Sequence, residues 1–450
     1  MYDLIVIGAG PGGYEAAAHA SRMGKKVALV ERQHIGGTCL NVGCIPTKAF
    51  LKSSKLFAEC RNAQAYGVKV SSVEFDLSAV VARKNRIVGT LTRGVAGLLK
   101  KAGVEIVRGH AELVSRNSVK VGEATYLAQN ILIATGSRPS VPPIPGIGSA
   151  NVLDSTAVLN LSQVPGAVAI IGGGYIGLEF ASFFSSVGAK VTVLEMLPHV
   201  AAGCDGDIAR RLAQELKKSG IEIRTSCRVT RIEGNSVQYE GPDASGTVVA
   251  DCILNATGRS PVIEDLGLDQ ANVDLYAKGI RTSDQGKTNA AGIWACGDVT
   301  GRRLLAHAAT REGIVAVNNM FGRRDRIRYD AIPSVIYTHP EVASVGRTEE
   351  ELKADGIAHK KAVVPMGVSG RFLIENEGVS GAVKVLAGER YGEILGVHAL
   401  GDSASEFIVA AAVMLENEMC LREAAQVVFP HPTVSEAMKE AMLRITEQES

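Results

Sequence analysis

The sequence predicts an α/β protein in which two domains built on parallel βαβ units are combined with an α+β domain at the C-terminus. Three observations predict this fold class. A strand–turn–helix–strand unit occurs twice, an Ala-Thr-Gly tripeptide ends a strand downstream of each copy, and the pattern changes to strands and then helices near Tyr329. With 450 residues the chain is too long for a single hydrophobic core. At the usual ~100 to 200 residues per domain, we expect three or four domains.

The first βαβ unit opens the chain. A short apolar strand leads into the glycine-rich run 8–13, an Ala-rich helix follows, and the second strand ends at Glu31. In such a G-x-G-x-x-G pattern Gly8 permits the tight turn, Gly10 lets a pyrophosphate approach the backbone, and Gly13 lets the helix pack on the strand. Glu31 is placed to accept hydrogen bonds from an adenosine ribose. The unit predicts a Rossmann-like dinucleotide site. The alternative, a purely structural turn, is disfavoured because the unit recurs.

The second βαβ unit repeats the first at a constant offset of 164 residues, which pairs Glu31 with Glu195. Its fingerprint glycines are Gly172, Gly174 and Gly177. A carboxylate at the end of the second strand pairs with a free ribose 2′-hydroxyl and repels a 2′-phosphate. Glu195 therefore favours NAD over NADP.

The remaining segments are assigned from their patterns. Residues 53–103 are predicted to be helical, with apolar positions at Val80, Ile87, Leu91, Val95 and Leu98. The Pro-rich stretch 138–145 is predicted to be the linker that leaves the first domain. From about Tyr329 a separate domain without a third fingerprint is expected.

Composition argues against several classes of function. Lys and Arg total 48 against 47 Asp and Glu, so no nucleic-acid partner is indicated. No apolar run reaches the ~18 residues of a membrane span, and Met1 runs directly into the first strand without room for a leader. The eight cysteines are scattered except for one pair, which fits a reducing compartment. We expect a cytoplasmic protein with no membrane contact.

That one pair is Cys39 and Cys44, which lie shortly after the first fingerprint. On a regular helix a five-residue separation places the two Cα atoms more than about 7 Å apart, too far for an unstrained disulfide. If the two cysteines bridge, the backbone between them must bend, which Gly43 and Pro46 would permit. So short a loop adds little stability when closed, and a strained bridge suits redox chemistry better. The alternative is a pair of reduced core cysteines.

Two dinucleotide sites and one nearby cysteine pair in a single chain indicate a relay through a bound flavin. A dithiol passes its electrons readily to a nicotinamide only through such an intermediary.

Taken together, the motifs resemble those of the flavin-dependent disulfide reductases, the class I pyridine nucleotide-disulfide oxidoreductases. The resemblance covers nearly the full length, and within the family it is strongest to the dihydrolipoyl dehydrogenases. The motifs that carry it are the run 36–48, both fingerprints, both Ala-Thr-Gly strands, 295–298, 305–308 and 431–436.

The resemblance implies a role for each matching residue near the cysteine pair. Cys39 would be the thiol that exchanges with the substrate, and Cys44 the thiol that lies against the flavin. Lys48 would sit beside the flavin ring and pair with Glu179. Without the resemblance, both of these charged residues would be read as solvated.

The resemblance also implies two sets of cofactor-binding residues. The FAD site would further include Ala111, Thr135, Gly136, Asp298, Leu304, Leu305, Ala306 and His307. The NAD site would include Tyr175, Glu179, Val229 and Gly258 beside the fingerprint glycines and Glu195, with Tyr175 covering the empty nicotinamide pocket.

His431 is the candidate base. Dithiol oxidation needs a base that titrates near neutral pH, because the thiolate is the attacking species. Glu436, five residues on, would hold the imidazole in one tautomer. The alternative is a histidine that is merely stiffened between Pro430 and Pro432. The resemblance implies that the base reaches the cysteines of the opposite subunit, and hence a homodimer.

The resemblance also implies the domain boundaries and the activity. Residues 1–140 and 261–328 would form the two parts of an FAD-binding and central domain, 141–260 an NAD-binding domain, and 329–450 an interface (dimerisation) domain. The enzyme would oxidise protein-bound dihydrolipoamide to lipoamide and reduce NAD⁺ through a Cys39–Cys44 redox disulfide, with FAD as cofactor and no metal. Its partner would be the lipoyl-bearing protein of a 2-oxoacid dehydrogenase or related complex.

Three alternatives stay open: a glutathione-type reductase, a mercuric reductase, and a flavoprotein that acts mainly as a structural component of a multienzyme assembly. Glutathione reductases generally use NADPH and carry basic residues where this chain has Glu195. Mercuric reductases carry a C-terminal cysteine pair, whereas the last cysteine here is Cys420.

The chain also departs from the family at Cys296, usually a non-thiol residue. It is either a neutral core substitution or a second site of thiol reactivity. Pro430 restricts the backbone before the base more than in many relatives.

Overall fold

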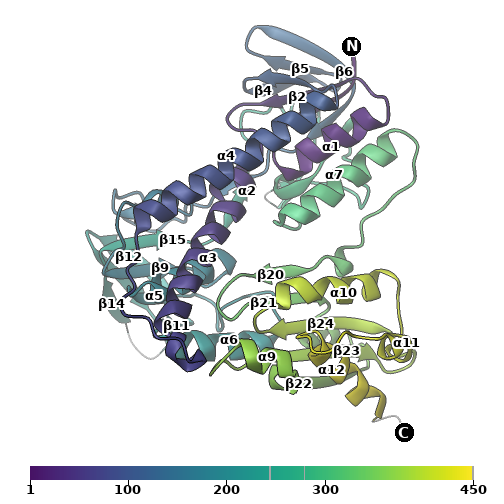
Figure 1. Ribbon diagram of the computed structural model, residues 1–450. Helices are drawn as coiled ribbons and strands as arrows, with labels where there is room; N and C mark the ends of the chain where they lie inside the picture. The colour runs from purple at the N-terminus through teal and green to yellow at the C-terminus, as the bar shows by residue number, and fades with distance from the viewer. Residues whose placement is uncertain (243–244, 278, 448–450) are drawn as a thin grey trace. The chain divides into compact units, whose positions relative to one another are not determined.

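The computed structural model describes residues 1–242, 245–277 and 279–447 (Figure 1). By their internal contacts these residues divide into two compact units. The first unit comprises Met1–Ala49, Ser78–Ser140 and Gly258–Ile327, and the second comprises Phe50–Leu77, Val141–Thr257 and the chain from Arg328 onward. The predicted α/β fold class is confirmed, whereas the predicted domain boundaries stay a prediction.

A seven-stranded sheet forms the centre of the first unit, in the order β3-β2-β1-β6-β5-β4 with β19 also paired to β6. The strands of this unit are β1 (Tyr2–Ile7), β2 (Val27–Glu31), β3 (Glu105–Arg108), β4 (Ala111–Ser115), β5 (Ser118–Val121), β6 (Ala124–Ile133), β7 (Ser137–Pro139), β16 (Arg259–Pro261), β17 (Leu275–Tyr276), β18 (Gly279–Ile280) and β19 (Ile293–Ala295). β1 is parallel to both β2 and β6. Leu4, Ile5 and Val6 are fully buried, as expected for a parallel strand covered on both faces.

Helices α1 (Pro11–Arg22) and α7 (Ala306–Met320) pack side by side in this unit (Figure 1). The contact is close because Gly313 on α7 faces Gly12 on α1. A Cβ at Gly313 would lie 2.5 Å from the Gly12 carbonyl oxygen. Small residues at the crossing thus bring the helix of the fingerprint against the helix that follows β19.

The predicted helical region 53–103 is only partly helical. The structure has α2 (Gly37–Val42), α3 (Cys44–Arg61), the short 3₁₀ turn η1 (Ala63–Tyr66) and α4 (Leu77–Lys101). Residues 67–76 are not helical, so the prediction is wrong there. Gly67, with φ of 76°, ends η1 in the left-handed conformation, a frequent helix terminator that the apolar spacing did not reveal. Of the predicted apolar positions Val80 is buried, but Leu91 is exposed.

The second unit contains the second βαβ unit. Its parallel sheet has the order β11-β10-β9-β15-β8 and is accompanied by the antiparallel sheet β12-β13-β14. The elements are β8 (Val152–Leu153), β9 (Ala167–Ile171), α5 (Tyr175–Ser186), β10 (Lys190–Leu194), α6 (Gly206–Lys218), β11 (Glu222–Arg224), β12 (Arg228–Glu233), β13 (Ser236–Glu240), β14 (Ser245–Val249) and β15 (Cys252–Asn255).

The C-terminal part of the second unit is an antiparallel sheet in the order β20-β21-β24-β23-β22. Its elements are β20 (Ser334–Ile336), β21 (Val342–Gly346), α8 (Glu349–Ala354), β22 (His359–Pro365), α9 (Gly370–Glu375), β23 (Ala382–Gly388), β24 (Ile394–Leu400), α10 (Ala404–Glu416), α11 (Leu421–Gln426) and α12 (Glu436–Glu447). Its core includes Phe372, Val385, Val397 and Met438. Across the described chain, no helix is long and apolar enough to cross a membrane.

Candidate active site

The two cysteines lie on successive helices rather than on one regular helix. Cys39 is in α2, which ends at Val42. Gly43 then breaks the helix with φ of −137° and ψ of −111°, and Cys44 begins α3. A Cβ at Gly43 would lie 3.0 Å from the Thr38 carbonyl oxygen, so glycine allows the tight break. The side chains of Cys39 and Cys44 are hydrogen-bonded to each other. The bend that a bridge would require is therefore present.

The charge around the pair is set by Lys48. The hydrogen bond with Cys44, together with burial, raises the pKa of the Cys39 thiol, while the positive charge of Lys48 acts in the opposite direction. Lys48 follows Cys44 by one turn of α3. A cation in this place favours a thiolate over a thiol.

Four of the residues predicted to bind FAD lie at the carboxyl ends of neighbouring parallel strands. Glu31 ends β2, Gly8 follows β1, Thr135 follows β6 and Asp298 follows β19. Because these strands are adjacent in the order β2-β1-β6-β19, the four positions share one edge of the sheet. Ligands of open α/β sheets bind at this edge.

The first glycine turn shows which glycines the fold needs and which a ligand needs. A Cβ at Gly8 would lie 2.3 Å from the Ala134 carbonyl oxygen, and one at Gly13 would lie 1.9 Å from that of Gly8. A Cβ at Gly10, in contrast, would meet no atom of the described residues within 4 Å. The open side of Gly10 therefore fits the approach of a pyrophosphate to the backbone.

Glu31 is held in place by the backbone. Its carboxylate accepts hydrogen bonds from the backbone N–H of Ala9 (2.8 Å) and of Gln33 (2.6 Å). A carboxylate has about four lone-pair positions, so two remain for ribose hydroxyls. These residues fit an FAD adenosine.

Asp298 is supported by two residues that the sequence reasoning missed. Ser137 Oγ donates a hydrogen bond to Asp298, and Arg259 donates to Ser137 Oγ and to the Ser137 carbonyl, each at 2.7 Å. Burial raises the pKa of Asp298, against the opposing effects of Ser137 and Arg259. A sequence signal did exist, because Ser137 and Arg259 each directly follow an Ala-Thr-Gly tripeptide.

The turn before Asp298 is also fixed from α7. Glu312, 4% exposed, accepts a hydrogen bond of 2.5 Å from the Gly297 backbone N–H. Cys296, 1% exposed, is part of the core beside Gly12. Because burial raises the pKa of its thiol well above the usual range, Cys296 fits the core substitution rather than a second reactive thiol.

The other residues predicted to bind FAD also belong to the first unit. Ala111 is buried and pairs with Val121. Thr135 uses its hydroxyl to donate to the Val262 carbonyl oxygen (2.7 Å), and Gly136 has φ of 72°. Leu304 to His307 lie at the start of α7. Their contacts with FAD stay predictions.

The second glycine turn repeats the geometry of the first. A Cβ at Gly172 would lie 2.5 Å from the Ala256 carbonyl oxygen, and one at Gly177 would lie 2.0 Å from that of Gly172. A Cβ at Gly174 would be clear of every described atom within 4 Å. The Glu195 carboxylate accepts hydrogen bonds from the backbone N–H of Gly173 (2.5 Å) and Leu197 (2.7 Å). These residues fit NAD as they would fit the adenosine of FAD.

The remaining residues predicted to bind NAD have varied surroundings. Tyr175 is the first residue of α5, and its hydroxyl lies 3.9 Å from Cys204 Sγ. Val229 is buried in a hydrophobic core cluster. Glu179 is 5% exposed and accepts a hydrogen bond of 3.0 Å from the Tyr337 backbone N–H, a contact that the sequence reasoning missed. Gly258 begins the last segment of the first unit.

The candidate base has the partner that the sequence predicts. Nδ1 of His431 lies 2.9 Å from Glu436 Oε1, and Oε2 of Glu436 accepts a hydrogen bond of 2.9 Å from the Thr433 backbone N–H. Two hydrogen bonds hold the pKa of the Glu436 carboxyl below its usual value. The one from the Thr433 backbone N–H has the larger effect, and the one with His431 is second. In the single chain the His431 side chain is 79% exposed. The geometry fits a base oriented by a carboxylate.

Comparisons with known proteins identify the class to which this site belongs. Residues 2–313 match the family model of the pyridine nucleotide-disulphide oxidoreductases, and residues 332–442 match the dimerisation domain of the same family. The chain belongs to the pyridine nucleotide-disulphide oxidoreductase family.

Individual relatives narrow the similarity further. The chain is 40% identical to dihydrolipoyl dehydrogenase 3 of Pseudomonas aeruginosa, over 99% of this chain and 98% of the relative. It is 38% identical to the mitochondrial dihydrolipoyl dehydrogenase 1 of Arabidopsis thaliana, over 98% of this chain and 90% of the relative. Among solved structures, LpdA of Mycobacterium tuberculosis matches with a TM-score of 0.90 and 26% identity, over 98% of this chain and 99% of the other. The sequence-based family assignment is confirmed.

Proposed function

We propose that the protein is an FAD-dependent dihydrolipoyl dehydrogenase, which oxidises a protein-bound dihydrolipoyl group to the disulfide and reduces NAD⁺ to NADH. The observation that carries the proposal is the Cys39–Cys44 pair, hydrogen-bonded across the helix break at Gly43. Full-length relatives at 38% and 40% identity carry the dihydrolipoyl dehydrogenase name. The glutathione-type, mercuric and purely structural alternatives are therefore not favoured.

The chemistry starts from the oxidised pair. His431 of the partner subunit takes a proton from one substrate thiol, and the thiolate attacks Cys39 Sγ. The Cys39–Cys44 bond breaks, and Cys44 leaves as a thiolate. The second substrate thiol then passes its proton to the departing Cys39 sulfur and attacks the substrate sulfur of the mixed disulfide. Cys39 leaves as a thiol, and the oxidised lipoyl group is released. When bound, FAD would supply the path by which the electron pair of the reduced Cys39 and Cys44 reaches NAD⁺ as a hydride, and the Cys39–Cys44 disulfide forms again.

Each residue of the chain has a defined task in this scheme. Lys48 favours the thiolate of the pair, since its positive charge acts against the Cys44 hydrogen bond and the burial that raise the pKa of the Cys39 thiol. Glu436 accepts from Nδ1 of His431 and so leaves Nε2 as the nitrogen that takes the proton. Glu31 and Asp298 would hold the two ends of FAD, and Glu195 the adenosine ribose of NAD.

The family's dimerisation domain supports a homodimer, which the shared active site requires. The proposed partner is a lipoyl-bearing protein of a 2-oxoacid dehydrogenase or related complex, and the proposed location is the cytoplasm.

The test compares two substrate pairs, NAD⁺ with dihydrolipoamide and NADPH with oxidised glutathione. We expect strong turnover with the first pair only, and turnover only with the second would overturn the proposal.

A Cys44→Ser variant should lose dihydrolipoamide oxidation. Cys60→Ser, on the same helix α3 and also partly exposed, is the matched control and should keep it. Full activity in Cys44→Ser would contradict the assigned role of the pair.

A further inference from the structure

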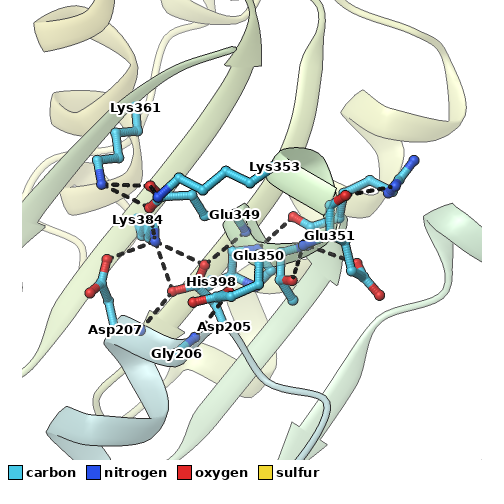
Figure 2. Close-up of polar contacts among 12 residues, drawn as sticks. Asp205, Gly206, Asp207, Glu349, Glu350, Glu351, Lys353, Lys361, Lys384 and His398 are labelled. Atoms are coloured by element: carbon cyan, nitrogen blue, oxygen red, sulfur yellow. Dashed lines mark hydrogen bonds and ion pairs between the residues drawn. The ribbon is translucent and has the colours of Figure 1, made fainter. Parts of the chain in front are cut away.

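A buried ion cluster lies in the second unit (Figure 2). Its centre is Lys384 on β23, whose side chain is fully buried. The ammonium lies 2.9 Å from Asp205, 2.7 Å from Asp207 and 2.6 Å from Glu349. A lysine is almost never fully buried unless it is paired, and this one faces three carboxylates.

The cluster balances its charge with two further lysines. Lys353 and Lys361 both reach Glu349, at 2.5 and 2.8 Å. Burial alone would lower the pKa of Lys384, but the hydrogen bonds to Asp207, Glu349 and Asp205 outweigh it and raise the pKa. The lysine therefore stays charged.

Asp205 makes the cluster more than a surface ion pair. It is fully buried and is the N-cap of α6, where it accepts from the Asp207 backbone N–H at 3.1 Å. It also accepts from the Glu349 backbone N–H at 3.1 Å. One carboxylate thus joins the start of α6, the start of α8 and, through Lys384, the sheet strand β23, as Figure 2 shows.

Asp205 also ends the loop that crosses the second glycine turn. The loop starts at Glu195, whose carboxylate is held by the Gly173 and Leu197 N–H groups. In its middle, the Ala201 backbone N–H donates to the Gly173 carbonyl oxygen at 2.8 Å. At its end Cys204, next to Asp205, lies 3.9 Å from the Tyr175 hydroxyl. Residues 195–205 are thus fixed to the turn at one end and to the ion cluster at the other.

We propose that Lys384 is a positioning residue for the pyridine nucleotide. By fixing Asp205 it holds the loop 195–205 against Gly173 and Tyr175, and so preserves the shape of the nucleotide site. The inference rests on the proposed function, which assigns this βαβ unit to NAD.

Stability alone does not account for the cluster. A buried ion pair contributes little net stability compared with packed apolar residues of similar volume, because both charges lose their hydration. Its directional contacts do fix geometry, since each carboxylate is held at a defined atom. The positions of Asp205 and of the loop that it ends are what the cluster determines.

The test compares Lys384→Met with Lys361→Met. Both variants remove a lysine from Glu349, but only Lys384 contacts Asp205. The first readout is the equilibrium dissociation constant of NADH with the FAD-loaded protein. The second is amide hydrogen exchange of residues 196–206 without nucleotide. For Lys384→Met we expect a dissociation constant about five- to tenfold higher, the lower end of typical coupling between sites, and faster exchange in the loop. Lys361→Met should match the wild type in both.

Equal NADH binding and equal loop exchange in the two variants would overturn the inference. If Lys384→Met does not fold, Cys204→Ala decides, because it removes the contact with Tyr175 and leaves the cluster intact. Weaker NADH binding in Cys204→Ala supports the inference, and unchanged binding contradicts it. A failure of the proposed function would show in the wild-type protein, which would then use NADPH in preference to NAD⁺. The loop exchange does not depend on that preference.

Discussion

The second glycine turn allows a substitution that separates ligand binding from folding. Gly174 has φ of −80° and ψ of −173°, which any residue can adopt, and a Cβ there would touch no described atom within 4 Å. Gly174→Ala should therefore fold normally. It should gain about 0.4 to 1 kcal/mol because the unfolded chain loses freedom. The added methyl group would stand where the pyrophosphate of NAD approaches the backbone.

The size of the binding defect follows from overpacking. A methyl group forced into an occupied site costs about 1 to 3 kcal/mol, which corresponds to an NADH affinity about five- to 150-fold weaker. The assay is equilibrium titration of the FAD-loaded protein with NADH, together with a thermal melt. Gly174→Ala should weaken binding and leave the melting temperature unchanged or slightly raised.

Gly177→Ala is the contrasting variant at the third fingerprint glycine. Its Cβ would lie 2.0 Å from the Gly172 carbonyl oxygen, far inside van der Waals contact. The strand and helix must separate to admit it, at about 3 kcal/mol or more, so this variant should melt earlier or fail to fold. Unchanged NADH affinity in Gly174→Ala would refute the assignment of the turn to NAD. Normal stability in Gly177→Ala would refute the packing argument.

Three further outcomes are expected. Glu436→Gln should slow dihydrolipoamide oxidation by about 10- to 100-fold, a fraction of the usual contribution of a general base, because His431 loses its charged partner; flavin reduction by NADH should be unchanged. Ser137→Ala should weaken FAD binding by about tenfold, since Asp298 loses a charge-assisted hydrogen bond worth about 1.5 kcal/mol or more; FAD retention on dialysis measures it. Burial would raise the pKa of Asp402, but His339 and Lys55 outweigh burial and hold it at about 2. The ionised Asp402 therefore stabilises the folded protein fully above the pKa of an aspartate in the unfolded chain, and this stabilisation is lost as the pH falls through about 2. Between pH 5 and pH 2, denaturant titration should show the wild type losing about 2 kcal/mol more than Asp402→Asn.

The features that the sequence predicted correctly are local in the chain. Each βαβ unit is specified by a continuous run of about 30 residues, in which apolar strands, glycines and a terminal acid follow one another. The bend between the cysteines depends on Gly43, which stands between them. The contact of His431 with Glu436 spans only five residues. Such patterns determine backbone geometry before any long-range contact forms.

The features that the sequence reasoning missed depend on residues far apart in the chain. Asp205 and Lys384 are 179 positions apart, and Ser137 and Arg259 are 122 apart. Alone, Asp205 and Lys384 are indistinguishable from solvated side chains, and Ser137 and Arg259 are marked only by the Ala-Thr-Gly tripeptide that precedes each of them. Only the folded chain removes the water and brings the partners together. The error at residues 67–76 has a different origin, because the apolar positions behind the prediction begin at Val80 and do not bear on the segment that follows the end of η1 at Gly67.

The internal repeat extends to individual hydrogen bonds, which affects how the two sites can differ. In the first copy Glu31 Oε2 accepts from Ala9 and Oε1 from Gln33. In the second, Glu195 Oε2 accepts from Gly173 and Oε1 from Leu197. All of these positions are related by the same offset of 164.

Because Glu31 and Glu195 are held by the same hydrogen bonds, these carboxylates do not determine which site binds FAD and which binds NAD. The two copies do differ after the strand that pairs with β6 in the first sheet, which is β19, and with β15 in the second, which is β8. In the first copy, β19 is followed by Asp298, which is largely buried and supported by Ser137. In the second, β8 is followed by Asp154, whose carboxylate is engaged by the backbone N–H groups of Thr156 and Ala157, both at 2.8 Å. A carboxylate turned toward its own backbone is a cap rather than a ligand contact. We therefore expect the preference of the first site for FAD to depend on Asp298 and the Ser137 contact, and not on the fingerprint that both copies share.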